Sequence, residues 1–134
     1  MKTLLRMEAT VNLDASSATS ATIFKAPGAG YIDVASCFVN FEEAIAAGGF
    51  SSTAGVASLE VGGVEVATYS TGVAPAAGKA IGDTALVTPV AAYADKAVTF
   101  AAGATIEAKT KTQGAGGTVT GTARFWIPVE FNLG

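Results

Sequence analysis

The sequence contains no histidine and only one cysteine, Cys37, among its 134 residues. Without histidine, neither a Ser-His-Asp nor a Cys-His catalytic arrangement can be built. A single cysteine cannot form a disulfide bond within the chain, and a zinc site of the usual kind lacks ligands. Because Cys37 lies within an apolar stretch, we expect it to be a small core residue. No acidic segment resembles an EF-hand loop, so we expect neither a metal ion nor another cofactor.

Charged residues are also scarce, at 14% of the chain with a formal net charge of -3. This charge is weak and of the wrong sign for a nucleic-acid partner. No apolar run approaches the roughly 18 residues of a membrane span. In the opening stretch MKTLLRMEATVNL, Arg6 and Glu8 interrupt the apolar segment that a signal peptide would need. We therefore expect no membrane partner, no signal peptide and synthesis in the cytoplasm.

The residues that are abundant favour β structure. Half of the chain is hydrophobic, but 28 of these residues are alanines, which contribute little buried area. The core must come mainly from 13 valines, 7 phenylalanines, 6 isoleucines and 6 leucines, and valine and phenylalanine favour strands. Together with 16 glycines and 16 threonines, this composition predicts a β-rich protein with many turns. The length fits one domain over residues 1–134.

Alternation of apolar and polar residues predicts about eight strands. The first, residues 4–13, has one apolar face: Leu5, Met7, Ala9, Val11 and Leu13. The last, residues 118–133, alternates over almost its whole length; its Pro128 lacks an amide donor and predicts a bulge or an edge position. The stretch 31–41 is apolar on both faces and predicts a central strand covered on both sides.

Two segments interrupt this pattern. Asn40 and Glu43 have the spacing of a capping box, and Gly48 follows, so residues 40–48 are either a short helix or a helical turn in a loop. Residues 71–96 predict a long loop with at most one short strand around TALVT; such a loop is usually functional or an assembly arm. The expected fold is all-β: an antiparallel β-sandwich, jelly-roll-like, with at most one short helix.

The stretch SLEVGGVEV, residues 58–66, predicts a two-residue hairpin in which Glu60 faces Glu65. Like charges in facing positions repel each other. Both carboxylates should point outward, because the opposite face carries an apolar stripe: Leu59, Val61, Val64 and Val66. Three interpretations stay open. The pair is solvated, or it binds cations such as Lys109, Lys111 and Arg124 in this chain or a neighbour, or it is a general acid and base. With no cleft or substrate indicated, we expect no enzyme.

Trp126 shares the polar register of the last strand with Arg124. Tryptophan and arginine are enriched where protein interfaces are strongest. The alternative is that another segment, such as 71–96, covers Trp126. The candidate interface residues are Trp126, Arg124, Glu60, Glu65, Tyr69, Lys109, Lys111, Leu4 and Leu5.

The chain resembles small virion proteins of tailed bacteriophages in three stretches: MKTLLRMEATVNL, APGAGYIDVASCFVNF and GTARFWIPVEFNL. It most resembles the capsid decoration, or cement, proteins. This resemblance implies binding to the outside of an assembled capsid, often as trimers, with no catalysis and no cofactor. The implied partners are the major capsid protein and further copies of the chain, with residues 1–8 as a candidate arm. The implied location is the virion surface, after synthesis in the host cytoplasm.

An alternative is a glycan-binding β-sandwich, such as a fibre or tail-tip domain. Its stacking platform would be drawn from Trp126, Tyr69, Tyr31 and Tyr93. Jelly rolls often host lectins, but this is an analogy from fold. A small enzyme that uses Glu60 and Glu65 is a third hypothesis, and the decoration protein is the one the sequence favours.

Overall fold

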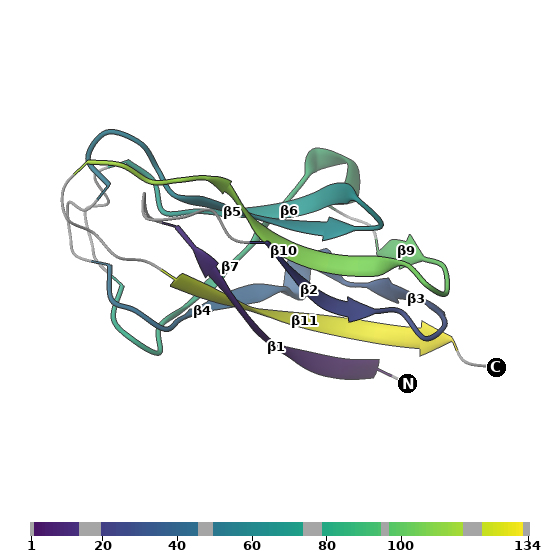
Figure 1. The fold of residues 1–134 in the computed structure, drawn as a ribbon. Coiled ribbons are helices and arrows are strands. Elements are labelled where there is room, and N and C mark those ends of the chain that lie inside the picture. Colours follow the sequence, from purple (N-terminus) through teal and green to yellow (C-terminus); the bar gives the residue numbers. More distant parts are fainter. Residues whose placement is uncertain are drawn as a thin grey trace.

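The computed structural model describes residues 2–13, 20–45, 50–73, 79–94, 97–116 and 122–132. They form two antiparallel β-sheets that pack face to face (Figure 1). The prediction of an all-β sandwich is confirmed, while the jelly-roll subtype stays a prediction. The described residues contain eleven strands, more than the eight or so expected, because two predicted segments each contain two short strands.

The first sheet, called sheet A here, is built around the long central strand β11 (Thr122–Asn132). Strand β1 (Lys2–Asn12) pairs with one edge of β11. The other edge pairs first with β4 and then with β3. The remaining members and their bounds are β4 (Phe38–Phe41), β7 (Thr84–Leu86), β3 (Ala29–Ile32) and β9 (Val98–Phe100).

The second sheet, sheet B, has five strands in the order β2-β10-β5-β6-β8. Their bounds are β2 (Ser20–Lys25), β10 (Thr105–Thr112), β5 (Val56–Val61), β6 (Val64–Ser70) and β8 (Thr88–Pro89). The chain crosses from sheet A to sheet B at Val87, which is buried and donates its amide to the carbonyl of Cys37 at 3.2 Å. At the end of β1, Thr110 of sheet B donates its hydroxyl to the carbonyl of Asn12 at 2.6 Å. The two sheets are therefore joined directly at both places.

The core lies between the inner faces of the two sheets. On β11, Phe125, Ile127 and Val129 are fully buried, as the alternation of the last strand predicted. Leu59 and Ile106 face them from sheet B, also fully buried. Burying a side chain of this size stabilises the fold by about 1.5–3 kcal/mol. Cys37 has no exposed surface, so its prediction as a core residue is confirmed.

The predicted central strand at 31–41 is interrupted, which corrects the sequence interpretation. A 3-10 turn, Val34–Ser36, separates β3 from β4. Asp33 holds the turn, since its carbonyl accepts the amide of Ser36 and its carboxylate accepts the Ser36 hydroxyl at 2.7 Å. This turn lies opposite Pro128, between the paired residues Trp126–Phe38 and Val129–Ile32. Strand β11, which contains Pro128, is therefore a central strand. The interruption lies in its partner, between β3 and β4.

Of the two alternatives for residues 40–48, the short helix does not form in the part that the structure describes; residues 46–49 lie outside it. Asn40 belongs to β4, and its side-chain amide donates to the carbonyl of Gly82 at 3.1 Å instead of capping a helix. Ile45 forms an isolated bridge with Lys79. Tertiary contacts with the 79–83 segment thus replace the local hydrogen bonds that a helix would have made.

Of the segments expected to be an arm and a long loop, the first is part of sheet A, and the second is a loop that contains two short strands. Within the candidate arm 1–8, Lys2–Arg6 pair with Glu130–Trp126 of β11. The predicted loop 71–96 contains β7, β8 and a 3-10 turn at Ala91–Tyr93, and the short strand expected around TALVT is β7 with β8. Residues 74–78 and 95–96 lie outside the described part. No described helix is long and apolar enough to cross a membrane.

Candidate functional site

The hairpin of β5 and β6 has the predicted turn. Glu60 pairs with Glu65 and Val61 with Val64, and the two glycines between them have φ values of +59° and +82°. Two successive positive φ angles are typical of the turn that suits a two-residue hairpin, and glycine adopts them without steric cost.

A bulge follows immediately and changes which side chains face the solvent. Leu59 pairs with Ala67, so Val66 is an extra residue on β6. An extra residue moves every later side chain of a strand to the opposite face. Tyr69 consequently points inward, is 7% exposed and meets the ring of Phe41 edge-on at 5.5 Å.

The structure corrects the sequence interpretation at Tyr69, which follows the bulge, and at Val64, which lies beside the turn. Burial raises the pKa of Tyr69, which is a core residue and not a surface candidate for an interface or a glycan platform. Because of the bulge, Ala67 is buried and Thr68 lies opposite Ser58. Val64, expected in the core stripe, is 53% exposed, whereas Leu59, Val61 and Val66 are buried.

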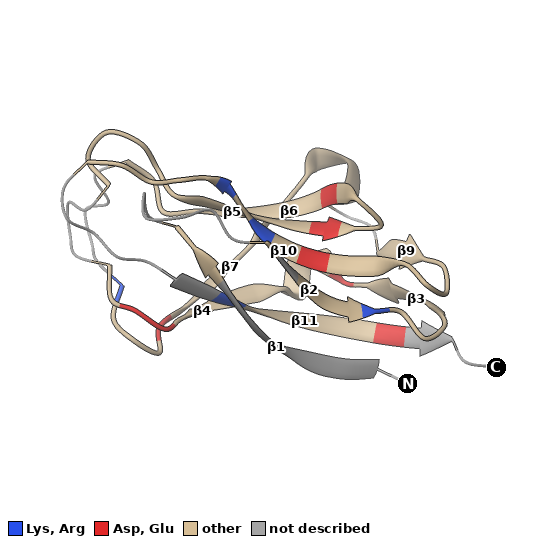
Figure 2. Cartoon of the chain, viewed as in Figure 1, with Lys and Arg blue, Asp and Glu red and all other residues tan. Residues whose placement is uncertain are grey.

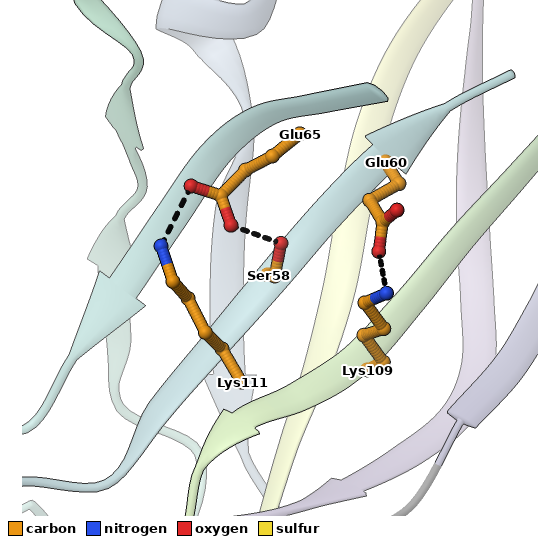
Figure 3. A network of polar contacts seen from close by, with 5 residues as sticks. All are labelled: Ser58, Glu60, Glu65, Lys109 and Lys111. Carbon is orange, nitrogen blue, oxygen red and sulfur yellow. Dashed lines mark hydrogen bonds and ion pairs between the residues drawn. The ribbon is translucent and has the colours of Figure 1, made fainter. Parts of the chain in front are cut away.

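The outer face of sheet B brings the two glutamates to the lysines of β10 (Figures 2 and 3). Glu65 lies 2.8 Å from the ammonium of Lys111 and accepts the Ser58 hydroxyl at 2.8 Å. The bond from Lys111 is the main reason why the pKa of Glu65 is lowered; Ser58 acts in the same direction and partial burial opposes both.

Glu60 forms a separate ion pair with Lys109. Only 11% of the Glu60 side chain is exposed, against 42% for Lys109. The bond to the Glu60 carboxylate raises the pKa of Lys109. Each glutamate of the facing pair therefore has its own lysine, which offsets the repulsion between the two carboxylates. We call these five residues, Ser58, Glu60, Glu65, Lys109 and Lys111, the carboxylate–lysine cluster.

The lowered pKa of Glu65 does not suit a general acid. A general acid at neutral pH needs a carboxyl group whose pKa is raised, whereas the pKa of Glu65 is lowered. Among the described residues, no group of three or more His, Cys, Asp or Glu side chains could hold a metal ion. Arg124, weighed at the sequence level as a cation for this pair, lies on sheet A and pairs with Glu42 instead.

The outer face of sheet A carries a row of apolar side chains across three strands. Trp126 of β11 pairs with Phe38 of β4, which pairs with Leu86 of β7. The rings of Trp126 and Phe38 are nearly parallel, with centroids 5.8 Å apart, and Leu86 is 69% exposed. Pro128 lies one alternation further along β11. We call Trp126, Phe38, Leu86 and Pro128 the tryptophan face.

Polar side chains lie at the two ends of this face. At one end, Arg124 pairs with Glu42, and their side chains are 23% and 24% exposed. At the other end, Tyr31 donates its hydroxyl to the carboxylate of Glu130. This bond raises the pKa of Tyr31. Along β11, the outward-facing residues are therefore Arg124, Trp126, Pro128 and Glu130, in that order.

Of the other candidates, Leu4 and Leu5 lie in β1, opposite Pro128 and Ile127 in the register of β11; their side chains are outside the described part. Tyr93 is half-buried and packs against the core. Sequence reasoning missed Phe38, Leu86, Glu42 and Ser58. Only Phe38 had a local signal, as an aromatic residue in a strand. The other three acquire their role from strands or loops distant in sequence.

Comparisons of the chain with protein-family models, with curated proteins and with solved structures found no match. The functional argument therefore rests on the two outer faces.

Proposed function

We propose that this chain is a structural protein of a virus particle that binds the outer surface of an assembled capsid and stabilises it. The tryptophan face carries this proposal. Trp126, Phe38 and Leu86 form a continuous apolar row on an outer sheet surface, in which Trp126 and Phe38 are half-buried and Leu86 is largely exposed. Contiguous exposed apolar residues with a polar border mark a surface that contacts another protein.

The rest of the molecule suits a docking role. Both sheets are paired antiparallel over their length, and the carboxylate–lysine cluster fixes the outer side of sheet B. A rigid body loses little conformational entropy when it binds. Many equivalent copies on one shell would reinforce each other, so that single contacts of modest strength suffice. The partners in this proposal are the major capsid protein and further copies of the chain.

The test is to mix the purified protein with expanded capsids that lack it, and to measure occupancy by sedimentation and electron microscopy. The wild-type chain should sediment with the capsids. Trp126→Ala should weaken binding at least tenfold, because aromatic residues at the centre of an interface contribute about 2 kcal/mol or more. Thr112→Ala, an exposed change on sheet B, is the matched control. A wild-type chain that stays in the supernatant would end the proposal.

Glycan binding is the second candidate, because Trp126 and Tyr31 lie on the same outer face of sheet A, and Glu130 beside Tyr31 provides a hydroxyl acceptor. A glycan array separates the two functions. Saturable binding of one sugar class that Trp126→Ala abolishes would favour the glycan module over the decoration protein.

A further inference from the structure

We infer that the partner of the tryptophan face is a second copy of this chain, in a twofold contact between the outer faces of two sheets A. The inference rests on the proposed function in one respect, that this face contacts protein. It deepens that function by naming the partner and replaces the threefold contact that the resemblance implies.

The order of residues on β11 carries the inference. The outward positions are Arg124, Trp126, Pro128 and Glu130, centred on the buried Ile127. Reversing this order exchanges the cation with the anion and the indole with the proline ring. The surface is therefore complementary to itself when two copies meet with their β11 strands antiparallel.

A twofold axis that lies between the two sheets, perpendicular to β11 at Ile127, produces this arrangement. Arg124 then faces Glu130 of the second copy, and Trp126 faces Pro128 of the second copy. Each contact occurs twice, as it must in an isologous interface. The axis parallel to β11 would instead place Arg124 over Arg124 and Glu130 over Glu130, so the charges of β11 itself favour the antiparallel arrangement.

The neighbours of β11 on its β4 and β3 side agree with this arrangement. In the sheet register, Arg124 lies beside Asn40, and Glu130 lies beside Tyr31. The antiparallel contact therefore places Asn40 opposite Tyr31 of the second copy, so that polar side chains lie at both ends of the β11 contact. Interfaces between proteins commonly have such an apolar centre and polar rim. Two sheets packed face to face in this way lie about 10 Å apart, which these side chains fill.

The charged groups retain capacity for the contact. Glu42 binds one terminal nitrogen of Arg124, and a guanidinium has five N–H donors. Glu130 accepts one hydroxyl, and an ionised carboxylate has about four acceptor positions. The two ends of the row are six residues apart, about 20 Å along a strand. This exceeds the screening length of about 8 Å at physiological salt, so the two ion pairs act independently.

Trp126 is the chain's one tryptophan, so its fluorescence reports directly on this face. We expect sedimentation to give twice the mass of the chain at high concentration. On dilution, the mass should fall to that of the monomer while Trp126 emission shifts to longer wavelength, as water reaches the ring. Both transitions should have the same midpoint.

Charge reversal tests the antiparallel register. Arg124→Glu and Glu130→Arg should each weaken self-association at least tenfold, because each opposes like charges across the axis. The double variant restores opposite charges and should return the dissociation constant to within about threefold of the wild-type value. Lys25→Glu, an exposed reversal on β2, is the control and should change nothing. Thermal unfolding shows which variants fold; if Arg124→Glu does not, Glu130→Arg still tests the contact.

A chain that is monomeric at all concentrations, a trimer, or a double variant without rescue would overturn the inference. These outcomes concern the twofold contact alone, and capsid binding is judged by its own test. A monomer whose capsid binding is lost in Trp126→Ala assigns the face to the capsid, against the inference and in favour of decoration. A dimer that does not bind capsids supports the inference and contradicts decoration.

Discussion

At the scale of single residues, the facing glutamates show how like charges are accommodated on a sheet. Glu60 and Glu65 lie opposite each other, as their spacing around the two glycines predicted. Lys109 and Lys111 lie two residues apart on β10, with β5 between β10 and β6, and each binds one glutamate. Of the three interpretations open at the sequence level, the structure shows ion pairs within the chain.

Glu65→Gln should lower the free energy of unfolding at pH 7 by about 0.5–1 kcal/mol, the range for a partly exposed ion pair. The folded-state pKa of Glu65 lies below its ordinary value of 4.5, so its contribution is present above pH 4.5 and is lost as the pH falls through the lowered pKa. Urea unfolding at pH 7 and at successively lower pH values measures this, and the two proteins should converge in acid.

Glu43→Gln is the control, since Glu43 is exposed and makes no ion pair among the described residues. It should follow the wild type at every pH. A stability difference for Glu65→Gln that stays constant from neutral to acidic pH would assign the effect to packing instead of charge.

At the scale of elements, β11 organises sheet A because both of its edges are paired. Its β1 edge is formed by Lys2–Arg6 and Thr10–Asn12, with an irregularity between them. The resemblance suggested residues 1–8 as a candidate arm. With this segment built into the sheet, its removal exposes the edge of the central strand.

Deleting residues 1–6 should therefore lower the free energy of unfolding by about 2–5 kcal/mol, since several ladder hydrogen bonds of about 1 kcal/mol each are lost. The uncovered edge of β11 should also promote aggregation, because unpaired strand edges template pairing with other chains. Urea unfolding and light scattering measure the two effects. Thr3→Ala keeps the backbone ladder and is the control. An unchanged unfolding midpoint would show that β1 contributes nothing to the fold.

At the scale of the whole molecule, the sandwich closes around Cys37. Burial, together with the nearby Asp33, raises the pKa of this thiol from 9.0 to about 12. The thiol of Cys37 donates a hydrogen bond to the carbonyl oxygen of Asp33, with Sγ 3.5 Å from that oxygen. Access to this sulfur requires the two sheets to separate, so its chemistry reports on the closure of the core.

Thiol-specific reagents act on the thiolate. At neutral pH the raised pKa reduces the thiolate fraction of Cys37 about a thousandfold, and burial slows access further. Labelling of the native protein should thus be at least about a thousandfold slower than labelling in denaturant. Thr99→Cys, which adds an exposed thiol on β9, should react rapidly at one site and shows that the reagent is active. Rapid labelling of Cys37 itself in the folded protein would contradict a closed core.

Several features followed from local pattern alone. Alternation assigned Phe125, Ile127 and Val129 to the core and Trp126 to the outside, because side chains of a strand alternate between its two faces. The two glycines of the hairpin identified its turn, since few residues adopt successive positive φ angles. An apolar neighbourhood placed Cys37 in the interior. The all-β fold itself followed from these short-range signals.

Other features were decided only by tertiary structure. A single-residue bulge at Val66 turned Tyr69 from the surface to the core, although the alternation of β6 gives no sign of it. Likewise, the pairing of Lys111 with Glu65 and of Phe38 with Leu86 depends on which strands become neighbours. Strand order is set by packing between segments far apart in the chain, which a local period of two does not encode. The sequence thus determined which residues face outward on most strands, and the assembly of the sheets decided which of them meet.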